Sequence, residues 1–147
     1  MINDTLNQKI TALAGALIDQ HKARTIVEPY ADKPGFWFGG GNMIAADDGS
    51  LYIAGRYRNS GDARTGVGKG ARGLELAIFC SRDGGRSFEK IVSFSKDDLN
   101  TDGKQVVSIE GVALHVADGN VELFVSTEKA GIDYPEGLED HKKPGTG

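Results

Sequence analysis

The sequence predicts an all-β chain that is preceded by a single N-terminal α-helix. Three observations support this prediction. Gly makes up 21 of the 147 residues, apolar segments of strand length alternate with turn sequences, and apolar residues recur at helical spacing within the first twenty positions. The turn sequences are ADDGS, RDGG, TDG and ADGN. A chain of this length is expected to form one compact domain with its own core.

The first predicted element is an amphipathic helix in residues 1–20. Asp4 comes before the apolar run and Lys9 is the one cation ahead of it, so the segment differs from a secretory signal peptide. The run ITALAGALI is far shorter than the ~20 residues that a bilayer-spanning helix needs, so no membrane segment is expected. The compartment stays open. The residues that form the apolar side of the helix are Ile2, Leu6, Ile10, Leu13 and Leu17.

Strands are predicted in two successive units after the helix. The first unit has four apolar segments of ordinary strand length, which we expect to form one antiparallel meander. The second unit begins in the same way, with two segments joined by ADGN. The predicted strands of the first unit are residues 41–46, 51–58, 74–80 and 87–94, and those of the second are residues 106–116 and 121–129.

Repetition of a four-stranded unit at about 40 to 50 residues is the signature of a β-propeller, whose blades stack face to face. We therefore expect a β-propeller fragment, with one four-stranded blade and part of a second. Residues 1–35 would be the helix and lead-in, residues 36–95 the first blade, and residues 96–147 a truncated second blade. The long insertion NSGDARTGVGKGARG in the first unit is a candidate functional loop.

The sequence SRDGGRSF in residues 81–88 predicts a self-contained turn between the third and fourth strands. The Ser81 hydroxyl and the Asp83 carboxylate can bond to backbone NH groups of the turn. The two glycines permit positive φ, and Phe88 can pack beneath the turn. Such a turn closes a hairpin without help from other segments.

This turn matches the Asp-box pattern, Ser/Thr-x-Asp-x-Gly-x-Thr/Ser-Trp/Phe. With it, residues 36–94 resemble the first blade of the sialidase and BNR-repeat superfamily, in which the Asp box is structural and lies far from the active site. The resemblance implies a β-propeller glycoside hydrolase without a cofactor. The matching residues are Ser81, Asp83, Gly85, Ser87 and Phe88.

The resemblance also implies roles for two residues. Arg56 is similar to the arginine that follows the second strand of sialidase first blades. Asp62 falls where that family has a loop aspartate that serves as general acid/base. The family's arginine before the first strand has no counterpart in WFGGGN, residues 37–42, and this difference argues against sialic acid as the substrate.

The segment from Arg56 to Arg72 contains five cations and a single acid, Asp62. Guanidinium groups hold carboxylate or sulfate in a bidentate fork. Arg56, Arg58 and Arg64 are therefore predicted to bind an acidic or otherwise polar glycan. A solvated basic loop is the alternative.

Further substrate contacts are predicted from the run WFGGGN. Its glycines would permit a close backbone approach to a ligand, and Trp37 and Phe38 could stack on a sugar ring. Asn42 is also predicted to contact the substrate. A tightly packed bend with core aromatic residues is the alternative.

The predicted catalytic pair is Asp62 and Glu110. Glycosidases use two carboxyl groups, or a nucleophile such as the sialidase tyrosine, and Glu110 lies on the first strand of the second unit. We expect Arg56, Asp62 and Glu110 to face a shared cleft. The alternative for Glu110 is a structural ion pair with a basic residue. Tyr57 and Tyr134 are poor candidates, because the family's tyrosine comes from a late blade.

Several function classes are disfavoured. The formal net charge of -4 gives no basis for wholesale nucleic-acid binding. The string GKGARG satisfies G-x-G-x-x-G, but a strand rather than a helix follows it. The three histidines lack metal-site spacing, so no metal is predicted. The single cysteine, Cys80, has apolar neighbours and is expected to be a buried thiol.

The preferred prediction is thus a sialidase-like glycoside hydrolase. A propeller polysaccharide lyase that acts on uronate glycans and a non-catalytic carbohydrate-binding propeller are the alternatives. Stacked repeats need about three units for a stable core. We therefore expect the 147-residue chain alone to be weakly active or inactive, and to associate through an uncovered blade face unless the N-terminal helix covers that face.

Overall fold

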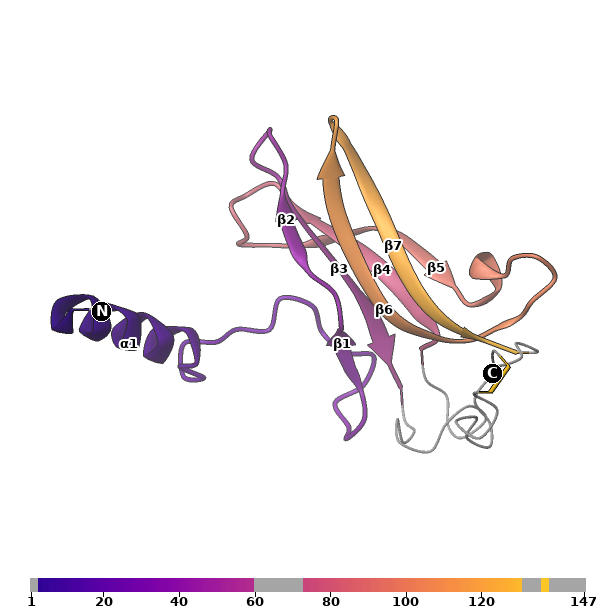
Figure 1. Ribbon diagram of the computed structural model, residues 1–147, viewed down its shortest axis with the longest axis horizontal. Helices are drawn as coiled ribbons and strands as arrows, with labels where there is room; N and C mark the ends of the chain where they lie inside the picture. The colour runs from indigo at the N-terminus through magenta and orange to yellow at the C-terminus, as the bar shows by residue number, and fades with distance from the viewer. Residues whose placement is uncertain (1–2, 60–72, 131–135, 138–147) are drawn as a thin grey trace.

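The computed structural model describes residues 3–59, 73–130 and 136–137. The described strands form two antiparallel sheets, and one helix lies at the N-terminal end of the chain (Figure 1). The predicted all-β class with an N-terminal helix is confirmed. The two sheets pack against each other, and the described residues do not close into a ring.

Helix α1 spans Asp4–Leu17 and projects away from the sheets (Figure 1). Asn3 caps it, because the Asn3 side chain accepts a hydrogen bond from the Leu6 backbone NH at 2.8 Å. None of the α1 residues is buried. Within the described ranges, no helix is long and apolar enough to cross a membrane.

The first sheet has five strands. In its order β1-β3-β4-β5, strand β3, Leu51–Arg58, also pairs with β2. Strand β1, Trp37–Gly39, pairs with the end of β3, and β2, Met43–Ala45, pairs with its beginning. The strand that we predicted in residues 41–46 is the shorter β2, and β1 was not predicted. Residues 40–42 between the two strands turn towards the second sheet.

The rest of the first sheet follows the predicted meander. Strand β4, Glu75–Ser81, pairs with β3, and β5, Glu89–Ser95, pairs with β4. All pairings in the sheet are antiparallel. A helix in residues 74–80 would have contradicted the prediction, but this segment is a strand.

The second sheet is a long hairpin. Its strands are β6, Val106–Ala117, and β7, Asn120–Lys129, and a short 3-10 helix, η2, Asp97–Leu99, precedes it. Asp118 and Gly119 form the connecting turn, with φ values of 50° and 74°. Positive φ at both central residues is what a type I′ hairpin turn requires.

The main core lies between the two sheets. Alternate residues of β3 and β4 face the hairpin, as strand geometry requires, and the hairpin contributes the opposite side. The second, smaller core lies on the other face of the first sheet, around Tyr57, Ala77 and Phe79. The buried residues of the main core are Ala54, Leu76, Ile78, Val106, Ile109, Val112 and Leu114.

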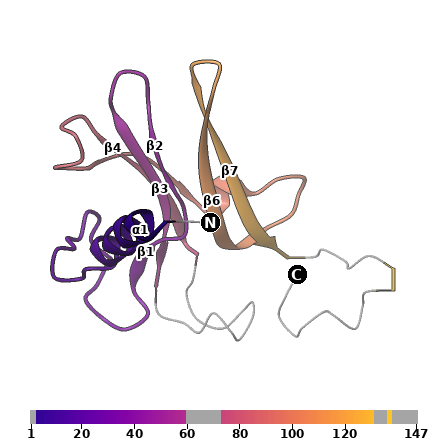
Figure 2. The ribbon, with the colours of Figure 1, turned by 60° about the vertical axis from the view of Figure 1, so that its left-hand side comes forward.

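The lead-in before β1 covers this second face. The Arg24 guanidinium donates hydrogen bonds to the backbone carbonyls of Gly85 and Arg86. Tyr30 stacks on Tyr57 with ring centroids 3.9 Å apart. These contacts hold residues 24–30 against the first sheet. Figure 2 shows α1 and the β6–β7 hairpin on opposite sides of that sheet.

The turn between β4 and β5 has the predicted self-contained hydrogen bonding. Asp83 Oδ1 accepts hydrogen bonds from the Ser81 hydroxyl at 2.8 Å and from the Arg86 and Ser87 backbone NH groups at 2.8 and 2.9 Å. Asp83 Oδ2 accepts from the Ser87 hydroxyl at 2.6 Å. These bonds, those from Ser87 most of all, hold the pKa of Asp83 well below its ordinary value.

Candidate functional site

Residues 40–42 connect the two sheets through backbone hydrogen bonds, and we call this connection the joint. The Ala54 NH donates to the Asn42 carbonyl at 3.1 Å, and the Val112 NH donates to the Gly40 carbonyl at 3.2 Å. A Cβ at Gly41 would lie 2.1 Å from the Ala54 carbonyl oxygen. The geometry of this glycine is therefore explained by the close approach of two strands, which is the packed-bend alternative considered for this run.

The Asn42 side chain belongs to the same joint. Its amide nitrogen donates to the Leu114 carbonyl at 2.9 Å, and its oxygen accepts from the Leu114 NH at 2.7 Å. Both ends of the amide thus bind the β6 backbone and connect the sheets. A role of Asn42 in substrate binding stays a prediction.

Arg56 and Glu110 meet next to this joint. Arg56 is 9% exposed, and its Nη1 donates to the Ile109 carbonyl at 3.0 Å and to Glu110 Oε2 at 3.3 Å. The Ser108 hydroxyl donates to Glu110 Oε1 at 2.6 Å. Both carboxylate oxygens are therefore positioned, while the Glu110 side chain keeps 28% of its surface exposed.

Local strand geometry explains how these residues come together. Arg56 lies two residues after Ala54 on β3, so both side chains face the hairpin. In the hairpin, Ile109 pairs with Thr127 and Gly111 pairs with Ser126, which leaves Glu110 as an extra residue in β6. Such bulges redirect a side chain and are over-represented next to active sites.

Trp37 covers the Arg56 guanidinium. The guanidinium carbon lies 5.3 Å from the centroid of the Trp37 ring, within the range of a cation–π contact. A Cβ at Gly39 would lie 3.3 Å from the ring, and one at Gly40 would lie 3.2 Å from Arg56 Nε. The glycines therefore leave room for Trp37 and Arg56, and Trp37 remains 39% exposed.

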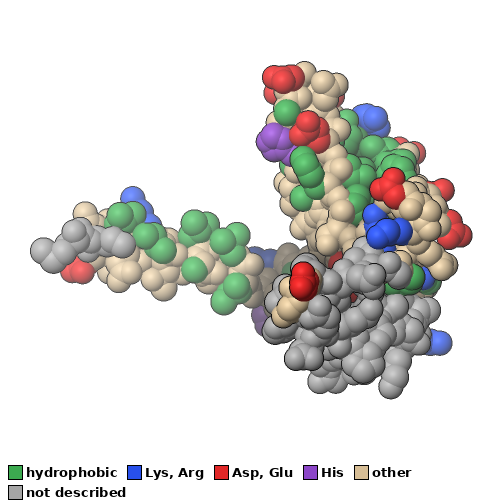
Figure 3. Space-filling view, turned by 45° about the vertical axis from the view of Figure 1, so that its right-hand side comes forward, with side chains coloured by type: hydrophobic (Ala, Val, Ile, Leu, Met, Phe, Trp, Pro, Cys, Tyr) green, Lys and Arg blue, Asp and Glu red, His purple; other side chains and the backbone are tan. Residues whose placement is uncertain are grey.

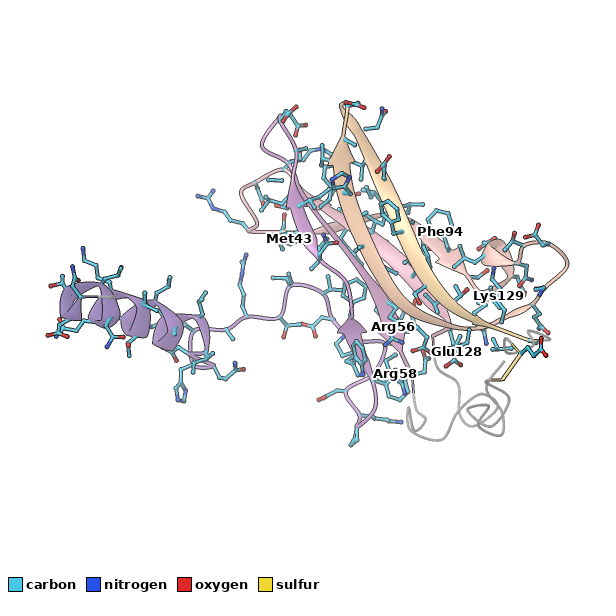
Figure 4. All side chains as sticks on the ribbon, in the orientation of Figure 1. Met43, Arg56, Arg58, Phe94, Glu128 and Lys129 are labelled. Carbon is cyan, nitrogen blue, oxygen red and sulfur yellow. The ribbon has the colours of Figure 1, made fainter. Side chains whose placement is uncertain are left out.

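Further charged residues lie at the same end of the sheets. Arg58 is 4% exposed and pairs with Trp37 in the β1–β3 register. Glu128 of β7 pairs with Ser108 and is half-buried. Figure 4 shows Arg56, Arg58 and Glu128 at this end, near the point where β3 finishes.

Ser108 and Glu128 were not singled out from the sequence. The spacing in SIE could have indicated Ser108, because residues two apart on a regular strand share a face. Glu128 carries no comparable signal, since only the register of β7 against β6 brings it beside Ser108.

Two predicted site residues, Asp62 and Arg64, lie outside the described residues, as does Tyr134. Arg56 and Glu110 form an ion pair, which is the structural alternative considered for Glu110. The catalytic pair of Asp62 and Glu110 stays a prediction. Tyr57 is 5% exposed and belongs to the second core, with its ring stacked on Tyr30. Tyr57 therefore lies on the sheet face opposite Arg56.

Other candidate chemistry is limited in the described part of the chain. Among those residues, no group of three or more His, Cys, Asp or Glu side chains could hold a metal ion. Cys80 is a free thiol with 2% exposure, so the prediction of a buried thiol is confirmed. The candidate site therefore consists of the Glu110 carboxylate, the buried Arg56 guanidinium and the partly exposed Trp37 ring.

Comparison with protein-family models, with curated proteins and with solved structures gave no match to this chain.

Proposed function

We propose that the two sheets are neighbouring blades of a sialidase-like β-propeller glycoside hydrolase that acts on a polar or acidic glycan. The Asp-box turn supports this proposal, because its hydrogen bonds centre on Asp83 and Ser81, the residues that define the pattern. The face-to-face packing of β3 and β4 against β6 also fits adjacent blades.

The observation that carries the proposal is the position of Glu110. Its carboxylate is held by the Ser108 hydroxyl and the Arg56 guanidinium, and a β-bulge directs it to the place where the sheets meet. A glycosidase needs a carboxylate fixed in this manner, either as nucleophile or as the base that activates water. Asp62, on the segment that follows β3, is the proposed second carboxyl group.

In this proposal Arg56 and Trp37 have different tasks. Arg56 is buried and bonded to Glu110 and to the β6 backbone, so it positions the catalytic carboxylate. Trp37 is partly exposed beside it and offers an aromatic surface to a sugar ring. Because Arg56 is bonded to Glu110 and to the β6 backbone, we favour hydrolysis over an elimination in which Arg56 itself would hold the substrate carboxylate.

Product analysis tests the proposal. The purified chain is incubated at high concentration with sialylated, uronate-containing and neutral oligosaccharides, and products are identified by mass spectrometry. We expect slow hydrolysis that Glu110→Gln reduces by at least about 100-fold, because general acid–base groups typically contribute 10²–10⁴-fold. Ser93→Ala, on the exposed part of β5, is the matched control and should leave the rate unchanged.

Other products would change the assignment. An unsaturated uronate would identify a lyase, and glycan binding without any product would identify a carbohydrate-binding propeller. If neither products nor glycan binding are found, or if Glu110→Gln hydrolyses glycans as fast as the natural chain does, the proposal is wrong.

A further inference from the structure

Helix α1 carries an exposed apolar stripe, defined here as Leu6, Ile10, Leu13 and Leu17. Their exposed fractions are 46%, 48%, 61% and 77%, and none of the helix residues is buried. Figure 3 shows hydrophobic side chains along the helix, clear of the body of the molecule. An isolated helix of 14 residues is marginally stable in water, so a partner for the stripe would stabilise it.

The β6–β7 hairpin has a second exposed apolar surface. The hairpin face is defined here as Gly111, Ala113, Phe124 and Ser126, which form two cross-strand pairs. Phe124 is 58% exposed beside three small residues. A hollow of about 360 Å³ is lined by these four residues together with Val112 and Val125. The three small residues leave a shallow depression beside the projecting Phe124 ring, and the convex surface of a helix fits such a depression.

The two surfaces cannot easily meet within one chain. They lie on opposite sides of the first sheet (Figure 2), and the lead-in is fastened to that sheet by Arg24 and Tyr30. Residues 18–23 connect α1 to Arg24 and span at most about 20 Å when extended. This tether keeps α1 on its own side of the sheet.

We propose that α1 of one copy docks its apolar stripe on the hairpin face of a second copy, and that the second copy does the same in return. The reciprocal contact is a two-fold arrangement in which both unpartnered surfaces are covered. Charge complementarity favours it, because Lys9 flanks the stripe one turn from Leu6 and Leu13, and the Glu122 carboxylate lies next to Phe124 on the same hairpin face. On its own hairpin Glu122 contacts the His115 ring at 3.3 Å, with half of its side chain exposed to a second cation.

The buried area sets the strength of the dimer. Each stripe and each hairpin face contributes a few side chains, so two reciprocal contacts bury on the order of 1,000 Å² in total. This area is at the lower limit for a specific interface. We therefore expect a reversible dimer that forms with rising protein concentration. The dimer does not require hydrolase activity, and either proposal can fail without the other.

Sedimentation equilibrium tests the dimer, at protein concentrations from about 5 µM to about 500 µM, where weak complexes form. The natural chain should approach twice the monomer mass at the highest concentrations. Leu13→Asp and Phe124→Asp should each remain monomeric. Gln8→Asp, which places the same charge on the opposite side of α1, is the control and should dimerise normally.

Ala113→Arg is a second hairpin variant, because a long side chain there fills the hollow without altering Phe124. Circular dichroism checks that each variant keeps its β signal. The proposal is overturned if the natural chain stays monomeric over the whole range. It is also overturned if Leu13→Asp alone blocks association, which would indicate helix–helix pairing, or if only the hairpin variants do, which would indicate sheet–sheet pairing.

Discussion

Replacing Gly41 with alanine should destabilise the joint between the sheets. The new Cβ would lie 2.1 Å from the Ala54 carbonyl oxygen and 2.7 Å from Val112 Cγ2. The backbone oxygen cannot rotate away, so the strands must separate by roughly 1 Å. Overpacking of this kind costs about 1–3 kcal/mol. The separation also weakens two backbone hydrogen bonds, those to the Gly40 and Asn42 carbonyls, at about 1 kcal/mol each.

We therefore expect Gly41→Ala to lower the free energy of unfolding by about 3–5 kcal/mol. Urea unfolding followed by the fluorescence of Trp37, the single tryptophan, measures this change next to the joint. Low protein concentration avoids any contribution from association. Gly111→Ala is the control, because its Cβ would meet only Ser126 at an ordinary 3.9 Å. Equal stability of the Gly41→Ala and Gly111→Ala variants would refute the close approach of the sheets.

Two more variants test hydrogen bonds that stabilise the fold. Asn42→Ala should lower the free energy of unfolding by about 2–4 kcal/mol in the absence of any glycan, because it leaves the NH and carbonyl of Leu114 without their partner. Urea unfolding measures this change. An unchanged free energy of unfolding would contradict a stabilising role of the two Asn42–Leu114 hydrogen bonds. Asp83→Asn should make the free energy of unfolding less dependent on pH in the acid range. The pKa of Asp83 is lowered in the folded chain, so its contribution is present above about pH 4 and is lost as pH falls through the lower folded value. Acid unfolding that is identical in both chains would show that the turn does not depend on the Asp83 charge.

Much of the first sheet could be predicted from the sequence because its signals are local. Strand-length apolar segments and turn residues predict β3, β4 and β5, and the turn at 81–88 contains both the donors and the acceptors of its hydrogen bonds. The amphipathic spacing of α1 is equally local. Such features need no knowledge of distant contacts.

The arrangement of β1 and β2 as two short strands beside β3 could not be predicted in this way. It depends on residues 40–42, which turn out of the sheet to bond with Val112 and Leu114, about seventy positions later. The structural role of Asn42 could not be predicted for the same reason, because its partner Leu114 is equally distant in sequence. A run of glycines is compatible with a ligand contact and with a close strand contact, and only the packing of β6 distinguishes them.

The candidate site was predicted in part. Arg56, Glu110 and Trp37 were chosen by residue type and position, and the structure brings them together. The bulge that isolates Glu110 depends on the β6–β7 register, as does the nearness of Ser108 and Glu128. Register is set by cross-strand packing, which a single sequence does not reveal.

Glycan binding at Trp37 is the most direct test of the central claim, that Trp37, Arg56 and Glu110 form a glycan site. The chain has one tryptophan, so its indole NH gives a single assignable signal in an isotope-labelled sample. Acidic and neutral oligosaccharides are titrated to millimolar concentration, with Glu110→Gln in parallel. We expect at least one glycan to shift the Trp37 signal in a saturable manner, and Glu110→Gln to change its affinity. A Trp37 signal that no glycan moves would contradict the account.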